Sequence, residues 1–172
     1  MKNIKDKIII RKANIQDAKK MVDYFNKVSG ESEFFTFREG EYYKSVKEEK
    51  EMIRKINMES NSLYLVVEYQ DEIIGNLILK GERGPFIRHS VEFGISICKR
   101  LWNKGIGNEL LTYMIKWCKD NKEIKKINLA VREDNHAIKL YEKVGFKKEG
   151  VRKKYMYRFN KFYDAVLMGM DL

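Results

Sequence analysis

A strand, a helix and a second strand follow one another between residues 90 and 132, and this order restricts the fold more than any other feature. Apolar and polar residues alternate over Ser90–Cys98 and again over Ile124–Arg132, as they do in half-buried strands. Between them, Gly105–Asn121 carries apolar residues at helical spacing. Two strands joined through a helix run parallel, with the helix packed over the sheet.

The rest of the chain predicts antiparallel strands and helices around this unit. A helix capped by Asn14 and ended by Gly30 follows the first strand, and residues 31–41 are expected to form a loop or an irregular helix. The 172 residues suit one domain, spanning 1–172. The predicted class is α+β with three layers, a mixed, mostly antiparallel sheet of about seven strands flanked by helices. The further strands are expected at Ile8–Lys12, Leu63–Tyr69, Ile73–Lys80, Lys148–Arg158 and Phe162–Asp171, and the further helices at Ser45–Met58 and Asn135–Val144.

The formal net charge of +10 suits an anionic partner, which can be nucleic acid, anionic lipid or a polyphosphate cofactor. The basic residues are scattered, with small clusters at Lys122–Lys126 and Lys147–Lys154. No RNA-binding signature is evident, so a solvated surface is the simplest interpretation. No apolar run reaches the roughly 18–20 residues of a membrane span, and the apolar N-terminal stretch is too short for a signal peptide. We expect a cytoplasmic protein. Cys98 and Cys118 form no CxxC pair, so no metal is expected.

A glycine loop separates the first strand of the parallel pair from its helix. Gly105 and Gly107 let the backbone turn tightly with its N–H groups facing outward, and the helix adds its positive end. Lys104 adds a positive charge. These features suit a pyrophosphate, although a glycine-rich turn without a ligand fits the same residues. The dinucleotide-binding fingerprint is excluded because Leu110 occupies its third glycine position.

The segment Val131–Phe146 resembles the signature of the GNAT superfamily of N-acyltransferases. Asn135, Ala137, Leu140–Tyr141 and Gly145–Phe146 stand at the spacing of that signature. The glycine loop upstream resembles the pyrophosphate motif of the same family. Trp102 departs from it, because the family usually has Gln or Arg at that position. Two further dipeptides resemble the subgroup of amino-acid, peptide or drug acetyltransferases, Glu149–Gly150 and Tyr163–Asp164.

The resemblance implies a site for acetyl-CoA as co-substrate. In such enzymes the two parallel strands splay apart, and the pantetheine arm lies in the gap like an added strand. The family also implies that Asn135 and Tyr141 contact this arm, and Asn135 additionally suits a helix cap. The implied main-chain contacts to pantetheine are those of Ile95, Ser96 and Ile97, and those to the pyrophosphate are the amides of Asn103, Lys104, Gly105, Ile106, Gly107 and Asn108.

The implied reaction is direct attack of an amine on a thioester. An alkyl ammonium is only about one part in a thousand neutral at pH 7, so a base is needed. Glu92, on the strand face opposite the apolar side chains, is the candidate base, and a surface glutamate is the alternative. Tyr141 is the candidate acid for the departing thiolate, and a core tyrosine is the alternative.

The acceptor is expected to be a primary amine of a small molecule or a peptide. Glu33 and Phe34 suit an ammonium and its stem, although an aromatic patch at the core edge explains them equally. Arg152–Tyr157 fits an acidic acceptor or the outer face of a strand. Relatives in the family often form dimers, so the resemblance is compatible with a homodimer, and no nucleic-acid or membrane partner is expected. Two alternative functions stay open, an inactive acyl-CoA-binding module and a basic nucleic-acid-binding protein.

Overall fold

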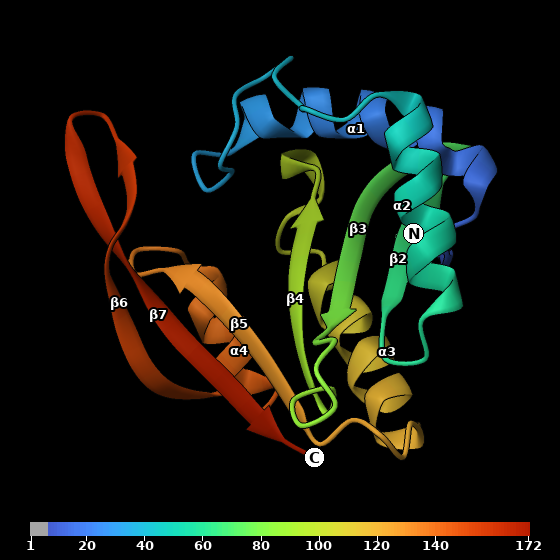
Figure 1. Cartoon of the computed structure of the whole chain (residues 1–172). Coiled ribbons are helices and arrows are strands. Elements are labelled where there is room, and N and C mark those ends of the chain that lie inside the picture. The colour runs from blue at the N-terminus through green and yellow to red at the C-terminus, as the bar shows by residue number, and fades with distance from the viewer. Residues whose placement is uncertain (1–6) are drawn as a thin grey trace.

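A single mixed sheet of seven strands organises the chain in the computed structural model, which describes residues 7–172 (Figure 1). All neighbouring strands are antiparallel except β4 and β5, so the predicted parallel crossover is confirmed. The order across the sheet is β1-β2-β3-β4-β5-β7-β6. The strands are β1 Ile9–Lys12, β2 Leu63–Tyr69, β3 Glu72–Gly81, β4 Ser90–Ile97, β5 Lys126–Arg132, β6 Lys147–Arg158 and β7 Lys161–Asp171.

Helices cover both faces of the sheet and complete the three predicted layers (Figure 1). On one face of β4, Ser96 meets Tyr24 of α1, their hydroxyl oxygens 3.0 Å apart. On the other face, the ring of Phe93 meets the ring of Tyr141 of α4, with centroids 5.8 Å apart. Side chains of β4 therefore divide between the two faces by alternation. The helices are α1 Ala18–Glu31, α2 Val46–Met58, α3 Ile106–Asp120 and α4 Ala137–Lys143, with short 3-10 helices η2 Ile15–Asp17 and η3 Lys99–Leu101.

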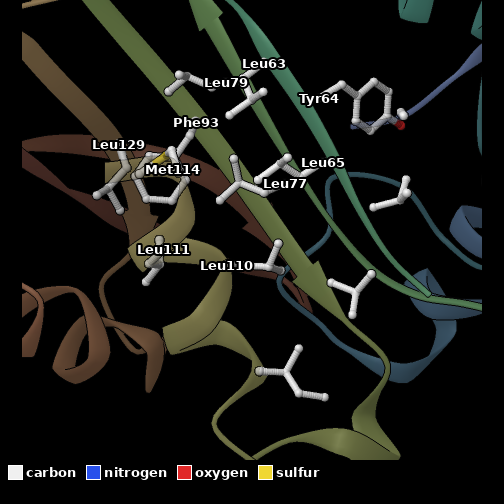
Figure 2. Close-up of a cluster of buried hydrophobic side chains, with 14 of the residues drawn as sticks. Leu63, Tyr64, Leu65, Leu77, Leu79, Phe93, Leu110, Leu111, Met114 and Leu129 are labelled. Atoms are coloured by element: carbon white, nitrogen blue, oxygen red, sulfur yellow. The ribbon is translucent and has the colours of Figure 1, made fainter. Parts of the chain in front are cut away.

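The main core lies between the central strands and α3 (Figure 2). Strands β2, β3, β4 and β5 contribute leucines and Phe93 to this layer. Helix α3 packs against them with the apolar face that its sequence predicts. This burial fixes β4 and the beginning of α3 relative to each other, which is what the site requires. The labelled core residues of these elements are Leu63, Leu65, Leu77, Leu79, Phe93, Leu110, Leu111, Met114 and Leu129, all buried.

Several element ends differ from the sequence prediction. Asn14 caps the first helical turn as expected, accepting from Gln16 N–H at 2.9 Å, but that turn is the 3-10 helix η2. Gly30 does not end α1, which continues to Glu31. The strand predicted over Ser90–Cys98 ends at Ile97, because the chain turns into η3.

Candidate active site

The parallel strands β4 and β5 diverge after a short contact. They pair only at Ser90 with Lys126, Val91 with Ile127 and Glu92 with Asn128, although both strands continue beyond these positions. The Asn128 side chain donates to Ser90 Oγ at 2.7 Å and to the Val91 carbonyl at 3.3 Å. Asn128 thus ties the strands together at the last position before they separate, a role that sequence reasoning missed.

The divergence leaves an edge of β4 without a neighbouring strand. Cys98 N–H donates to the Ile74 carbonyl at 2.9 Å. Hydrogen-bonded pairs alternate along an antiparallel ladder, so the main-chain N–H and C=O groups of the even-numbered residues of β4 point toward β3. Ile95 and Ile97 therefore turn theirs toward the gap. Ser96 does not, because its main chain faces β3 and its hydroxyl lies between Tyr24 and Asn76. The main-chain contact expected at Ser96 is thus not available.

Trp102, the residue that departs from the family motif, forms a hydrogen bond with one carbonyl of this edge. Its indole N–H donates to the Ile97 carbonyl at 2.8 Å, and its ring is partly exposed. Lys99 lies over the ring at 6.0 Å. An indole in this position keeps the loop folded against the end of β4 and leaves Ile95 with free main-chain groups.

The glycine loop ends in a helix start that no side chain caps. Gly105 has φ 80, in the left-handed region where side chains are strained, and no cap hydrogen bond from a side chain reaches α3. The first intrahelical bond is Glu109 N–H to the Gly105 carbonyl at 3.2 Å. The preceding amides of the first turn have no intrahelical partner, which is the usual arrangement for binding an anion. Asn103 and Lys104, before this turn, are exposed.

Gly107 brings three elements together at the open end of the gap. A Cβ built there lies 3.1 Å from Leu140 Cδ2 of α4 and 3.5 Å from Ile97 Cδ1 of β4. The loop, the free edge of β4 and the helix that carries Tyr141 therefore converge on one point. Ile106 and Asn108 flank it, Ile106 buried and Asn108 half-buried.

Tyr141 lies on the α4 side of β4, buried among aromatic rings. Its ring makes edge contacts with Phe93 and with Phe146, with centroids 5.8 and 6.2 Å apart. Burial raises the pKa of the Tyr141 hydroxyl to about 12, so the group is a hydrogen-bond donor at neutral pH. A thiol has a pKa of about 8.5 and is the stronger acid, so Tyr141 suits hydrogen bonding to a thiolate better than full proton transfer.

Asn135 stands at the start of α4 and acts as its cap. Its Oδ1 accepts from Ala137 N–H at 2.9 Å, and its carbonyl accepts from Ile138 N–H at 3.1 Å. The helix itself is shorter than predicted, because it starts only at Ala137 and ends at Lys143. Capping explains Asn135 in this structure without any ligand.

Glu92 lies at the last paired position of β4, where the gap begins, and its side chain is exposed. It projects from the face opposite Phe93, so Glu92 and Tyr141 flank the strand from opposite sides. Gly94 follows on the Glu92 face, and a Cβ there would meet nothing within 4 Å. Open space therefore lies beside the candidate base.

The segment after α1 bridges the far ends of the two diverging strands. Glu31 Oε2 accepts from Lys99 N–H at 2.6 Å, just beyond β4. Glu33 Oε2 accepts from Arg132 at 2.9 Å, at the end of β5. Residues 31–33 thus cross the open mouth of the gap. Glu33 is partnered by a cation of the protein, so it is not a free carboxylate for an amine.

Arg132 is the centre of this bridge. Its side chain is 2% exposed and also binds Asp134, with Nε to Oδ1 at 2.6 Å. Its guanidinium lies between the rings of Phe34 and Tyr163, 4.4 and 4.2 Å from their centroids. Burial acts to lower the pKa of Arg132, but the two carboxylates outweigh it and the pKa is raised. Phe34 is therefore held by Arg132, which sequence reasoning did not single out.

We expect Arg132→Met to lower the free energy of unfolding by about 2–3 kcal/mol, because methionine fills the stacked position but binds neither carboxylate. Arg132→Lys should recover little of this, since an ammonium cannot bind two carboxylates and stack between two rings. Urea unfolding measures both. The control is Arg88→Met, which removes an exposed ion pair with Glu123 and should change stability by less than about 0.5 kcal/mol. If the Arg132 and Arg88 variants lowered the free energy of unfolding equally, Arg132 would not stabilise the protein through its contacts across the gap.

The acceptor residues and the candidate base are not brought together. Asn128 pairs with Glu92, and Arg132 follows four residues later on the same strand. At 3.3 Å per residue this is about 13 Å. Glu33 and Phe34 therefore lie at the mouth of the gap, whereas Glu92 lies at its closed end.

The fold, the diverging strands and the uncapped loop agree with the comparison to known families. The model of the acetyltransferase (GNAT) family matches residues 30–146, which is more than half of the chain. The chain belongs to this family.

Comparisons with individual proteins agree with this family membership. The chain is 35% identical over 105 residues to L-amino acid N-acetyltransferase AaaT of Escherichia coli, and the match covers 60% of this chain and 65% of that protein. A GNAT-family acetyltransferase structure from Streptococcus pneumoniae superposes with a TM-score of 0.92 at 29% identity, covering 96% of this chain and 99% of that one. The structure of yncA from Salmonella typhimurium with its cofactor acetyl-CoA shares the fold with a TM-score of 0.82 at 17% identity, covering 96% of this chain and 94% of that one.

Two features are absent from residues 7–172, the part of the chain that the structure describes. No cluster of three or more His, Cys, Asp or Glu side chains that can hold a metal ion occurs in this part of the chain. None of its helices has the length and apolar character needed to cross a bilayer.

Proposed function

We propose that this chain transfers an acetyl group from acetyl-CoA to a primary amine of a small molecule or peptide. The observation that carries the proposal is the separation of β4 from β5 directly before the uncapped start of α3. The free main-chain groups of Ile95 and the N–H of Ile97 suit the amide groups of pantetheine, and the first-turn amides with Lys104 suit the pyrophosphate. The residues present thus fit this co-substrate.

Acetyl-CoA supplies the acetyl group as a thioester. Glu92, directly or through a water, takes one proton from the acceptor ammonium, which leaves an amine able to attack. The Ile95 N–H donates to the oxygen on which charge develops. As the C–N bond forms and the C–S bond breaks, Tyr141 donates a hydrogen bond to the sulfur. The second amine proton goes to solvent and solvent protonates the thiolate, so the products are an amide and free CoA.

The test is thiol release from acetyl-CoA with a panel of amines that begins with L-amino acids, because the Escherichia coli relative is named for them. Peptides with free N-termini and polyamines follow. The proposal expects at least one acceptor that releases thiol and becomes acetylated by mass spectrometry. Stabilisation by acetyl-CoA without thiol release over the whole panel would instead support an acyl-CoA-binding module.

Glu92→Gln is expected to lower kcat/KM by roughly a hundredfold, because a base contributes about 10²–10⁴-fold to such a reaction. The acid limb of the pH–rate profile should also flatten, since the amide does not titrate. Glu82→Gln removes the same charge from an exposed position outside the gap and should leave the profile intact. An unaltered profile in Glu92→Gln would remove this residue from the mechanism.

Gly94→Val tests where the acceptor lies. The new side chain enters the open space beside Glu92 and meets no protein atom within 4 Å at its Cβ. We expect KM for the amine to rise about tenfold while acetyl-CoA affinity changes little. Valine suits a strand better than glycine, so stability should hold or rise by up to about 1 kcal/mol. An unchanged KM would place the acceptor elsewhere.

A further inference from the structure

Strands β6 and β7 continue beyond the rest of the sheet as a two-stranded arm (Figure 1). Strand β5 pairs with β7 only from Asp171 to Ala165, so the first residues of β7 pair with β6 alone. We call residues 152–163, which form this projection, the hairpin arm. Its inner side contacts the bridge, where Arg158 donates to the Glu33 carbonyl at 3.0 Å. Among the described contacts, no other segment of the chain packs against its outer side.

The hairpin arm is strongly basic. It carries no aspartate or glutamate, and its charge of +5 is half of the net charge of the whole chain. A local positive potential of this kind attracts polyanions. The five basic residues are Arg152, Lys153, Lys154, Arg158 and Lys161.

Exposed aromatic rings accompany these cations. Tyr157 and Phe162 face each other across the two strands, with centroids 4.8 Å apart, and are 61% and 52% exposed. Lys154 lies 5.3 Å from the centre of the Phe162 ring, and Arg152 lies 5.6 Å from that of Tyr155. Rings and cations therefore share one outward face of the hairpin arm.

The tip of the arm adds an exposed aromatic residue. Phe159 and Asn160 both have positive φ, 51 and 55, in the turn between the strands. Asparagine accepts this conformation, whereas a bulky residue there is an outlier. A two-residue hairpin loop favours positive φ at both of its residues, which explains this conformation. Phe159 is 69% exposed, and its ring centroid lies 5.1 Å from the Arg158 guanidinium, so the tip adds an exposed ring beside a cation.

The edge of the arm is unsuited to a second copy of the chain. Lys153, Lys154 and Tyr155 bulge out of β6 opposite Asp164, which accepts from Lys153 Nζ at 2.7 Å and from Lys154 N–H at 2.9 Å. Such a bulge, with lysines on an edge strand, prevents strand addition. Two arms of equal charge would also repel each other.

We propose that the outward face of the hairpin arm binds single-stranded nucleic acid. Bases stack on exposed rings while neighbouring cations bind the phosphates, and this needs rings and cations side by side. A membrane surface would instead need an apolar face separated from the charges, which the arm lacks. The proposal departs from the expectation that the chain has no nucleic-acid partner. That expectation rested on basic residues that are scattered along the sequence with only small clusters, whereas a charge equal to half of the net charge lies on one projection of the fold.

The test is fluorescence anisotropy of the whole chain with labelled oligouridylate and oligothymidylate of about 12 nucleotides over a salt series. We expect either both oligonucleotides or the oligouridylate alone to bind, and this binding should weaken as the salt concentration rises. Tyr157→Ala with Phe162→Ala should weaken it at least roughly tenfold at constant charge, because this variant lacks the rings on which bases stack. Arg152→Gln with Lys154→Gln should weaken it and reduce the slope against log salt by about 1–2.

The matched control is Lys47→Gln with Lys50→Gln, which removes the same charge from exposed positions on α2, away from the arm (Figure 1). Circular dichroism should show that every variant is folded. The proposal is overturned if the control weakens binding as much as the arm variants, or if the ring variant binds normally. It is also overturned if polyglutamate or anionic vesicles, but no oligonucleotide, require the rings. None of these measurements uses acetyl-CoA, so the outcome is independent of the proposed acetyl transfer.

Discussion

Gly105→Val is expected to reduce acetyl-CoA affinity by on the order of a hundredfold or more. Gly105 has φ 80, and a β-branched residue is strongly disfavoured there. To relieve the strain the peptide must rotate, and the amides of Gly105 and its neighbours then leave the position they share at the start of α3. Losing two charge-assisted hydrogen bonds, each about 1.5–3 kcal/mol, is sufficient for this effect.

Gly40→Val separates the loss of the phosphate site from the strain itself. Gly40 has a similar φ of 74, and a Cβ there meets nothing within 4 Å, so the backbone penalty is comparable. It lies in the loop after α1, away from the start of α3. Calorimetry should therefore show nearly normal acetyl-CoA binding for Gly40→Val and little or none for Gly105→Val. Equal losses in both variants would mean that strain, and not the amides, determines affinity.

The centre of the sheet was predictable because β4 and β5 both alternate between apolar and polar residues. The alternation over β4 and β5, with a helix between them, forces a parallel pair in any compact arrangement. The caps were predictable for a similar local reason, as Asn14 shows. The signature around Tyr141 predicted the family, and the family model confirms it.

The point at which the two strands separate could not be predicted. It depends on Asn128, whose side chain reaches Ser90 and Val91 on the other strand, and nothing local marks an asparagine in a strand for that role. Alternation predicted the side-chain faces of β4, but not that the Ser96 main chain turns toward β3. That orientation is set by the register with β3.

The contact between Glu33 and Arg132 across the gap could not be predicted from the sequence either. Glu33 and Phe34 looked like acceptor groups because their partner, Arg132, is 99 residues away. The charges of Glu33 and Arg132 satisfy each other only after α1 and β5 are assembled. The hairpin arm was missed for the same reason, since alternation cannot distinguish a strand in the sheet from one that projects beyond it.

Placing Glu92 and Tyr141 on opposite faces of β4 has a mechanistic consequence. In the proposed mechanism the amine loses its proton on one side of the strand and the sulfur is stabilised on the other, so the two groups do not compete for one space. Removing either group should therefore affect a different step. Tyr141→Phe is the change that tests the sulfur side alone.

Tyr141→Phe is expected to lower kcat by about 10- to 100-fold with nearly unchanged acetyl-CoA affinity, because it removes a donor to the developing thiolate. Phenylalanine keeps the edge contacts with Phe93 and Phe146, so the melting temperature should not change. The control is Tyr113→Phe on the exposed side of α3, which should keep full activity.

The pH dependence distinguishes Tyr141 as a hydrogen-bond donor from Tyr141 as a titrating acid. Because burial raises its pKa to about 12, the hydroxyl stays protonated throughout the range of about pH 7 to 10, where the acceptor amine itself titrates. The ratio of kcat between the native chain and Tyr141→Phe should therefore stay constant over that range. A ratio that falls as the pH rises would mean that the Tyr141 hydroxyl ionises below pH 10 and that its environment at the sulfur is more polar than the aromatic cluster shows.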